Sequence, residues 1–171
     1  MEFNKEKFKK VLHYLISECG SKDNVGKTVF YKLLYFADFN FFELYETPLT
    51  NESYRKLPYG PAPIHFEEAI KELTNEGKIN VELVPSYYND RFKYSSLKEP
   101  EVDFTDDELA VINEVLKLSN MNATQISAYS HGDMPWRAAK EYGIMKYSFV
   151  FYRDPKYSVR SYDDTNWCCL S

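Results

Sequence analysis

The residues of this chain that could carry out chemistry are few, and they gather in one short run. Ser130-His131-Gly132-Asp133 places a hydroxyl, an imidazole and a carboxylate close together. Members of a catalytic triad converge from separate elements and act beside an oxyanion hole, so sequence neighbours alone do not form one. We interpret His131 as the end of a helix and Asp133 as the cap of the next helix. No catalytic residue is predicted.

A second run superficially imitates a phosphate-binding loop. Such a loop has four residues between its glycines and follows a strand. Here five residues separate Gly20 from Gly26, and the run follows an apolar stripe of helical period. The three histidines also lack the spacing that would place two of them on one helix face as metal ligands. The sequence therefore predicts no nucleotide, cofactor or metal site.

Residues 106–130 suggest a different function, because two predicted helices joined by a turn at Ser119–Met121 imitate a helix-turn-helix. The second helix offers Thr124, Gln125, Ser127 and Tyr129 to a groove, but it contains no Lys or Arg. A net charge of −5 and a pI near 5.3 also argue against broad affinity for nucleic acid. A nucleic-acid-binding transcriptional regulator is therefore the alternative function.

The elements that would position these residues are mainly helices. Apolar residues recur at three- and four-residue spacing, which predicts amphipathic helices. The predicted helices are residues 3–19, 25–45, 64–76, 106–118, 122–130 and 134–142. Apolar side chains occupy nearly every face of residues 25–45, which indicates a central buried helix. Thr105 with Glu108, and Asn122 with Gln125, have the spacing of capping boxes.

The segments between the helices predict a smaller β component. Residues 46–63 contain four prolines with interleaved apolar residues, which is typical of an ordered loop. Apolar and polar residues alternate over residues 78–84, and residues 87–94 follow across Asn89-Asp90, which predicts a β-hairpin. Alternating aromatics in the last thirty residues favour an extended arm or hairpin. We expect a mainly α fold, one compact helical domain over residues 1–171 with a small β-hairpin and a C-terminal extended arm or hairpin.

The composition is that of a folded protein, with 44% hydrophobic and 27% charged residues. Its unusual feature is 15 Tyr and 12 Phe, which suit both a core built of rings and a protein-binding surface. The longest apolar stretch, Val29–Phe42, is interrupted by Lys32 and Asp38, so it does not predict a membrane span. The N-terminus shows no signal-peptide pattern, and the three cysteines form no disulfide or zinc framework. We expect a cytoplasmic protein.

Three motifs together carry a family resemblance. The first is Lys32–Asp38, the second runs from Pro48 through Tyr54 to Pro61, and the third is Ser130-His131 followed by Pro135-Trp136. In this order and spacing they resemble the Panacea domain, the SocA-like antitoxin family of bacterial and phage toxin–antitoxin systems. The segment Val150–Arg160 resembles the tail of phage-associated members. The motif residues taken from this resemblance are Tyr35, Asp38, Tyr59, Gly60, Pro61, His131, Pro135 and Trp136.

The resemblance implies a mainly helical fold and a function in neutralising a toxin encoded next door. Antitoxins of this kind bind their cognate toxin directly, and at least one relative delivers the toxin to a protease. Many members carry an additional DNA-binding domain, for which a chain of 171 residues has no room. The implied partners are therefore a toxin and a protease, while the oligomeric state stays open.

The motif residues are expected to build the fold more than to touch a partner, because buried aromatic residues are far commoner in cores than in hot spots. Gly60 and Pro61 can define a backbone turn. Exposed aromatic residues are better candidates for toxin contact. These candidates are Tyr87, Tyr88, Phe92 and Tyr94 in the hairpin, and Tyr152 and Arg153 in the C-terminal segment. Packing within the hairpin is the alternative for the first four.

Overall fold

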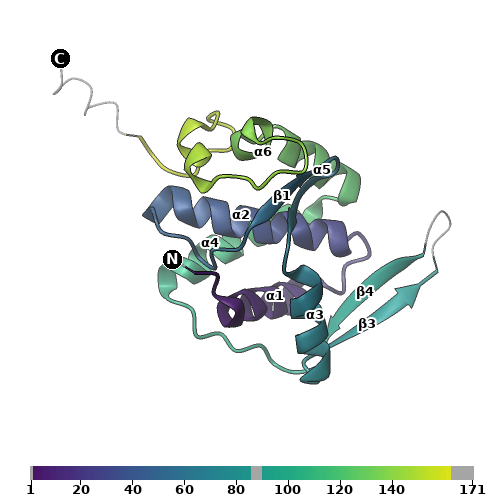
Figure 1. The fold of residues 1–171 in the computed structure, drawn as a ribbon. Helices are drawn as coiled ribbons and strands as arrows, with labels where there is room; N and C mark the ends of the chain where they lie inside the picture. The colour runs from purple at the N-terminus through teal and green to yellow at the C-terminus, as the bar shows by residue number, and fades with distance from the viewer. Residues whose placement is uncertain (1, 86–89, 163–171) are drawn as a thin grey trace, which may run out of the picture.

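Helices supply most of the regular structure in the computed structural model, which describes residues 2–85 and 90–162. Figure 1 shows their arrangement around one long helix, α2. The helices are α1 (Lys5–Cys19), α2 (Lys27–Tyr45), α3 (Phe66–Asn75), α4 (Asp106–Leu116), η1 (Lys117–Asn120), α5 (Ala123–His131), α6 (Met134–Ala138) and η2 (Tyr147–Tyr152). The strands are β1 (Tyr54–Leu57), β2 (Gly60–Pro63), β3 (Ile79–Val84) and β4 (Arg91–Ser96).

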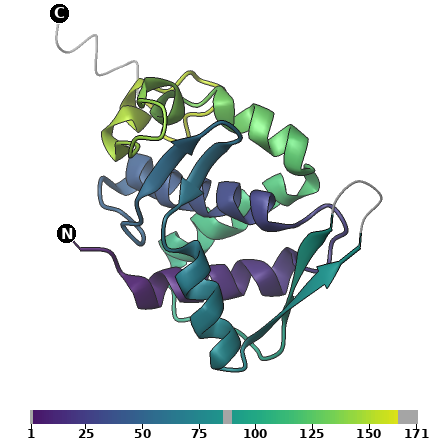
Figure 2. The same ribbon diagram turned by 45° about the vertical axis from the view of Figure 1, so that its right-hand side comes forward.

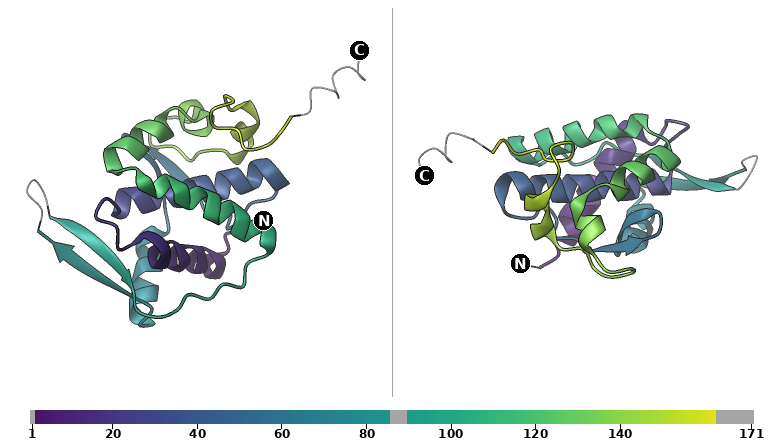
Figure 3. Two further views of the ribbon diagram at one scale, coloured as in Figure 1. Left: turned by 180° about the vertical axis from the view of Figure 1, so that it is seen from behind. Right: turned by 90° about the horizontal axis from the view of Figure 1, so that it is seen from above.

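The helix α2 is the centre of the molecule, as its sequence predicts. Its neighbours are α1, α4, α5, β2 and η2, which together cover it on several sides (Figures 1 and 3). Val29, Leu33 and Phe39 have no exposed surface. A helix that is apolar all round requires such covering on every side. The core is one connected cluster that extends from Phe8 of α1 to Tyr157 beyond η2.

The predicted helix starts are confirmed at two capping boxes. The Thr105 side chain accepts from the Glu108 amide while the Glu108 carboxylate accepts from the Thr105 amide, and Asn122 and Gln125 do the same for α5. The last predicted helix is too long, because α6 ends at Ala138 and not at residue 142. The chain there turns back to lie along β1.

The predicted loop over residues 46–63 is wrong in one respect, since it contains the β1–β2 hairpin in front of α2 (Figure 2). Pro61 pairs with Lys56 and Pro63 with Tyr54, at positions alternating with the hydrogen-bonded pairs. A proline in a two-stranded sheet costs no ladder bond where its nitrogen faces away from the partner strand. Proline content alone therefore concealed a strand.

The predicted hairpin of the middle region is confirmed as β3–β4, which projects from the helical body (Figure 1). Among the described residues, strand β4 begins at Arg91; Tyr87 and Tyr88 lie outside the described residues, as do Cys168 and Cys169. At the base of the hairpin, Ile79 and Tyr94 are 1% and 3% exposed and join the core.

The mainly α fold class is confirmed, and so is a C-terminal extension beyond the helical body; within the described residues this extension contains no strand. The alternating aromatics of residues 147–152 form the 3₁₀ helix η2, and Val150 within it is fully buried against α2. Beyond η2 the chain turns over residues 155–157, where the Asp154 carbonyl accepts from the amides of Tyr157 and Ser158. In the part of the chain that the structure describes, no helix is both long and apolar enough to cross a membrane.

Candidate partner-binding site

Two motif residues of α2 fasten other segments to the central helix. The Tyr35 hydroxyl donates to Asp133 at 2.7 Å. The Asp38 carboxylate accepts from the Thr50 amide at 2.8 Å, from the Thr50 hydroxyl and from the Tyr54 hydroxyl at 2.5 Å. Burial raises the pKa of Asp38 to about 6, although these hydrogen bonds oppose the rise. Both side chains hold the fold together from within, as expected for motif residues.

Arg153 joins the C-terminal segment to this framework. Its guanidinium donates to both oxygens of Asp133, at 2.9 and 2.8 Å, and to Glu43 at 3.0 Å. The side chains of Arg153, Asp133 and Glu43 have no exposed surface. Burial alone would lower the pKa of Arg153, but Asp133 and Glu43 raise it. Arg153 was a candidate for toxin contact, and that prediction is wrong because its guanidinium is enclosed.

The run at residues 130–133 does not form a catalytic triad. The Ser130 hydroxyl donates to a carbonyl within α5 at 2.8 Å, and the Asp133 carboxylate is directed to Arg153. His131 is the last residue of α5, and Asp133 caps α6 by accepting from the Met134 amide. This confirms the interpretation of the run as a helix junction. Within the described ranges, no three His, Cys, Asp or Glu side chains are placed to hold a metal ion.

Trp136 connects that junction to the β1–β2 hairpin. Its indole nitrogen donates to the Leu57 carbonyl at 3.2 Å, and the Lys56 ammonium lies 4.2 Å from the ring centroid. The His131 ring also stacks on Trp136, with ring centroids 4.3 Å apart. The buried His131 Nε2 has no hydrogen-bond partner among the described residues. Pro135 is buried between these groups and the core.

The turn of the β1–β2 hairpin separates its two motif residues. Gly60 has a φ of 113°, a conformation that favours glycine, and a Cβ there would lie 2.5 Å from the Ser130 hydroxyl and 2.7 Å from Lys32 Cε. Pro61 is buried beside it. Tyr59 is different, because 76% of it is exposed. Among the motif residues, all of which the structure describes, Tyr59 is the one with a largely exposed side chain.

Lys32, beneath Gly60, was not predicted as a site residue. Lys32 is only 1% exposed, and its ammonium makes no hydrogen bond or ion pair with any residue that the structure describes. The nearest aromatic contact of its ammonium is the Tyr31 ring, 5.6 Å away. Burial lowers the pKa of Lys32 to about 8. A buried cation without a counter-ion is costly, so it marks this place in the fold as unusual.

A surface groove lies beside Lys32, between the β1–β2 turn and α5. Its volume of about 360 Å³ gives room for one or two inserted side chains. It is lined by Thr28, Tyr59, Ala123, Thr124, Ser127, Ala128 and His131. Thr28 precedes Lys32 by one turn of α2, so both lie on the same side of that helix.

Three more of the predicted contact residues are placed by the structure. Tyr94 is core and therefore does not offer a contact surface. Phe92 is 47% exposed and pairs across the hairpin with Leu83, which is 57% exposed. Tyr152 is 69% exposed at the end of η2. Phe92 and Tyr152 remain candidates on surfaces separate from the groove.

The helix-turn-helix alternative gains no support from the geometry. The predicted turn is filled by the 3₁₀ helix η1, and Ser127 of the second helix is 8% exposed. The sequence of α5 contains no Lys or Arg to meet phosphates.

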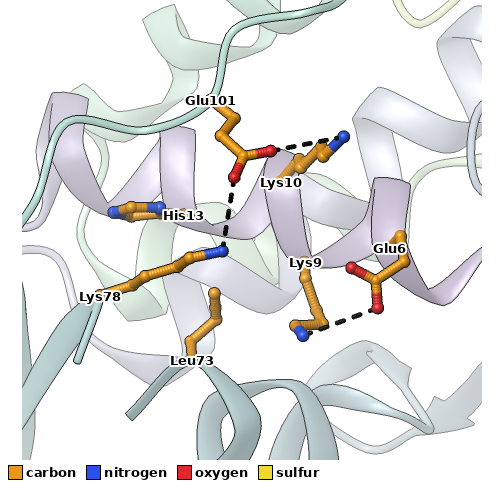
Figure 4. A pocket seen from close by; sticks show the side chains of 7 residues that line it. All are labelled: Glu6, Lys9, Lys10, His13, Leu73, Lys78 and Glu101. Carbon is orange, nitrogen blue, oxygen red and sulfur yellow. Dashed lines mark ion pairs between the residues drawn. The ribbon is translucent and has the colours of Figure 1, made fainter. Parts of the chain in front are cut away.

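A second depression, on α1 and α3, shows what an ordinary charged surface looks like in this protein. Figure 4 shows Lys9 paired with Glu6 at 3.7 Å, and Glu101 between Lys10 and Lys78 at 3.6 and 3.7 Å. Each cation has an anion at hand, so nothing there requires an external ligand.

Taken together, these features define a mainly α-helical protein in which buried polar contacts hold α2, the β1–β2 hairpin and the C-terminal segment around one core. Residues 30–137 match the family described as Antitoxin SocA-like, Panacea domain; this is more than half of the chain, which therefore belongs to that family. The resemblance drawn from the three motifs is confirmed. No curated protein and no solved structure matches the chain. Helix α1 and η2 lie outside the matched residues but share the same core.

Proposed function

We propose that this protein is the antitoxin of a toxin–antitoxin pair and that it neutralises its cognate toxin by binding it directly. Membership in the SocA-like antitoxin family carries this proposal. The geometry supports it, because the Ser130 hydroxyl and the Asp133 carboxylate, which could do chemistry, are committed to hydrogen bonds within the fold. We further propose that the chain acts as one domain, since one core includes residues from Phe8 to Tyr157.

Expression of the neighbouring gene, alone and together with this protein, tests the proposal. We expect growth arrest from the neighbouring gene alone, restored growth with both, and a stoichiometric complex on purification. A neighbouring gene that is harmless alone, or equally lethal with this protein present, would contradict the proposal. Arg153→Met serves as a control, because loss of the buried ion pairs should destabilise the protein and weaken protection.

Delivery of the toxin to a protease is the finer form of the same proposal. The lifetime of the toxin, followed after translation is blocked, separates the two modes. Simple occlusion predicts an unchanged or longer lifetime when this protein is present. Delivery predicts a shorter lifetime that returns to normal in cells lacking the protease.

A further inference from the structure

We propose that the groove between the β1–β2 turn and α5 is the toxin-binding surface, and that it receives an acidic side chain of the toxin on the Lys32 ammonium. This inference rests on the proposed antitoxin function and names the surface and the chemistry by which it acts. Three observations, each independent of the family match, lead to it.

The first observation is the burial of an unneutralised cation. Lys32 is 1% exposed, and none of the carboxylates that the structure describes pairs with it. Every other lysine with less than a tenth of its surface exposed has an acidic partner: Lys9 contacts Glu72 and Glu76, and Lys56 lies 3.7 Å from Glu141. The molecule therefore supplies counter-ions to its buried lysines except at this position. A counter-ion from outside the chain would complete the pattern.

The second observation is the position of that cation beside a groove. A Cβ on Gly60 would lie 3.2 Å from the Lys32 ammonium, so the ammonium sits directly beneath the β1–β2 turn. Tyr59, the preceding residue, and Thr28, one helical turn away, both line the groove. Lys32 does not itself line the groove; its ammonium lies behind the β1–β2 turn, which carries the lining residue Tyr59.

The third observation is an unsatisfied polar atom at the same groove. His131 lines it, and His131 Nε2 is buried without a hydrogen-bond partner among the described residues. Buried polar atoms are nearly always hydrogen-bonded, and each exception calls for an explanation. One carboxylate has two oxygens and four lone-pair directions, enough for both Lys32 and His131.

The rim of the groove suits a protein partner. Tyr59 is 76% exposed, and tyrosine is among the residues that most often dominate binding energy at interfaces. Ala128 of α5 and Thr124 give a short, mostly apolar floor. Such a rim would exclude water from an ion pair between Lys32 and an acidic side chain of the toxin. Exclusion of water strengthens an ion pair.

Measured affinities for the purified toxin test the inference. Lys32→Met keeps the length of the side chain and removes the charge. We expect it to weaken binding by about 30-fold or more, because a carboxylate would then be buried unpaired. The matched control is Lys9→Met, a buried lysine on the opposite side of the core, which should bind within about threefold of wild type. A thermal melt confirms that each variant is folded.

A second variant keeps the test decisive if Lys32→Met does not fold. Ala128→Trp fills the groove from an exposed position, and Lys71→Trp places the same bulk on an exposed position of α3. The first should abolish binding and the second should leave it unchanged. Equal affinity of wild type, Lys32→Met and Ala128→Trp would overturn the inference while leaving the antitoxin function intact. A wild-type protein that does not bind the toxin would overturn both.

The acidic character of the occupant is tested by a double-mutant cycle. Each Asp and Glu of the toxin is changed to its amide and measured against wild type and Lys32→Met. One substitution should weaken binding to wild type and have no further effect in the Lys32→Met background. Absence of any such coupled carboxylate would overturn the assignment.

Discussion

The two halves of α2 differ in whether a buried charged side chain has a partner of opposite charge. In the C-terminal half, Glu43 accepts from Arg153, and Arg153 also pairs with Asp133. In the N-terminal half, Lys32 is as deeply buried and meets no anion within the described residues. Burial works against ionisation of Glu43, but hydrogen bonds from Ser158 and the Val159 amide, together with Arg153, hold its pKa below the ordinary value. For Lys32 nothing opposes burial, and its pKa falls to about 8.

The difference separates architecture from function. A buried ion pair with all its hydrogen bonds in place ties distant segments together, and here it ties the C-terminal segment to α2 and to the α5–α6 junction. A buried charge without a partner contributes nothing to the fold and lowers its stability. Contacts within the chain are enough to explain the ion pairs of Arg153. We attribute the unpaired charge of Lys32 to the toxin that we propose as its partner.

The largest effect on stability should come from removing the ion pairs of Arg153. Arg153→Met leaves Asp133 and Glu43 buried without their cation, and we expect a loss of about 3–5 kcal/mol in the free energy of unfolding. Urea unfolding followed by circular dichroism measures it. Arg160→Met is the control, because Arg160 pairs with Glu46 at the surface at 3.4 Å and should matter by less than about 1 kcal/mol. A variant of Arg153 within 1 kcal/mol of wild type would contradict the comparison.

Removing the unpaired charge of Lys32 should instead raise the free energy of unfolding. Lys32→Met removes a desolvated charge and should stabilise the free protein by about 1–3 kcal/mol at pH 7. Because the pKa of Lys32 is lower in the folded protein than its ordinary 10.5, the unfolded chain binds more protons between pH 8 and 10.5. Wild-type stability therefore gains on the variant as the pH rises through this range. The difference in melting temperature between Lys32→Met and wild type should be largest below pH 8 and should vanish near pH 10.5.

Other titrations near Lys32 do not confuse this measurement. Tyr31 on α2, Tyr59 on the β1–β2 turn and His131 on α5 are the titratable groups that the structure places around it. All three are present in both proteins, so their contributions cancel to first order in the difference. A gap that stays constant from pH 7 to 10.5 would show that Lys32 is not the charged group responsible.

Much of the fold could be predicted because its signals are local. The apolar stripes located the helices, and the capping boxes at Thr105 and Asn122 fixed two helix starts. The β1–β2 hairpin could not be predicted, because prolines are rare in strands and their tolerance depends on which way each nitrogen faces. The 3₁₀ helix η2 was concealed in the same manner, since alternating aromatics imitate a strand until tertiary packing against α2 decides.

The site was predicted less well, for a reason that lies in long-range geometry. The motif residues were found, and Tyr35 and Asp38 prove to be structural. Lys32 belongs to the same motif but looked like an interruption of an apolar helix. Whether a buried lysine has a counter-ion depends on tertiary contacts. A local sequence pattern therefore cannot show that Lys32 lacks one. Arg153 was misjudged for the matching reason, because its partners Asp133 and Glu43 are 20 and 110 positions away.

A smaller effect compares two buried lysines directly. Lys9 is 4% exposed and contacts Glu72 and Glu76, whereas Lys32 has no such partners. Lys9→Met should therefore destabilise the protein by about 1 kcal/mol or less, since it removes one cation from two partly exposed carboxylates that keep Lys5 and Lys78 as partners. The same urea titration measures both variants. If Lys9→Met and Lys32→Met shift stability in the same direction, pairing does not distinguish the two sites.

The smallest effect on stability, and the sharpest on binding, should come from Tyr59. At 76% exposure its ring contributes little to the fold, and Tyr59→Ala should change the free energy of unfolding by less than about 0.5 kcal/mol. As the rim of the groove it should weaken toxin binding by about tenfold or more. Tyr152→Ala is the matched control, because Tyr152 is 69% exposed on the C-terminal segment. Loss of binding with Tyr152→Ala alone would move the toxin-binding surface from the unpaired half of α2 to the paired half, and the unneutralised charge of Lys32 would then need another explanation.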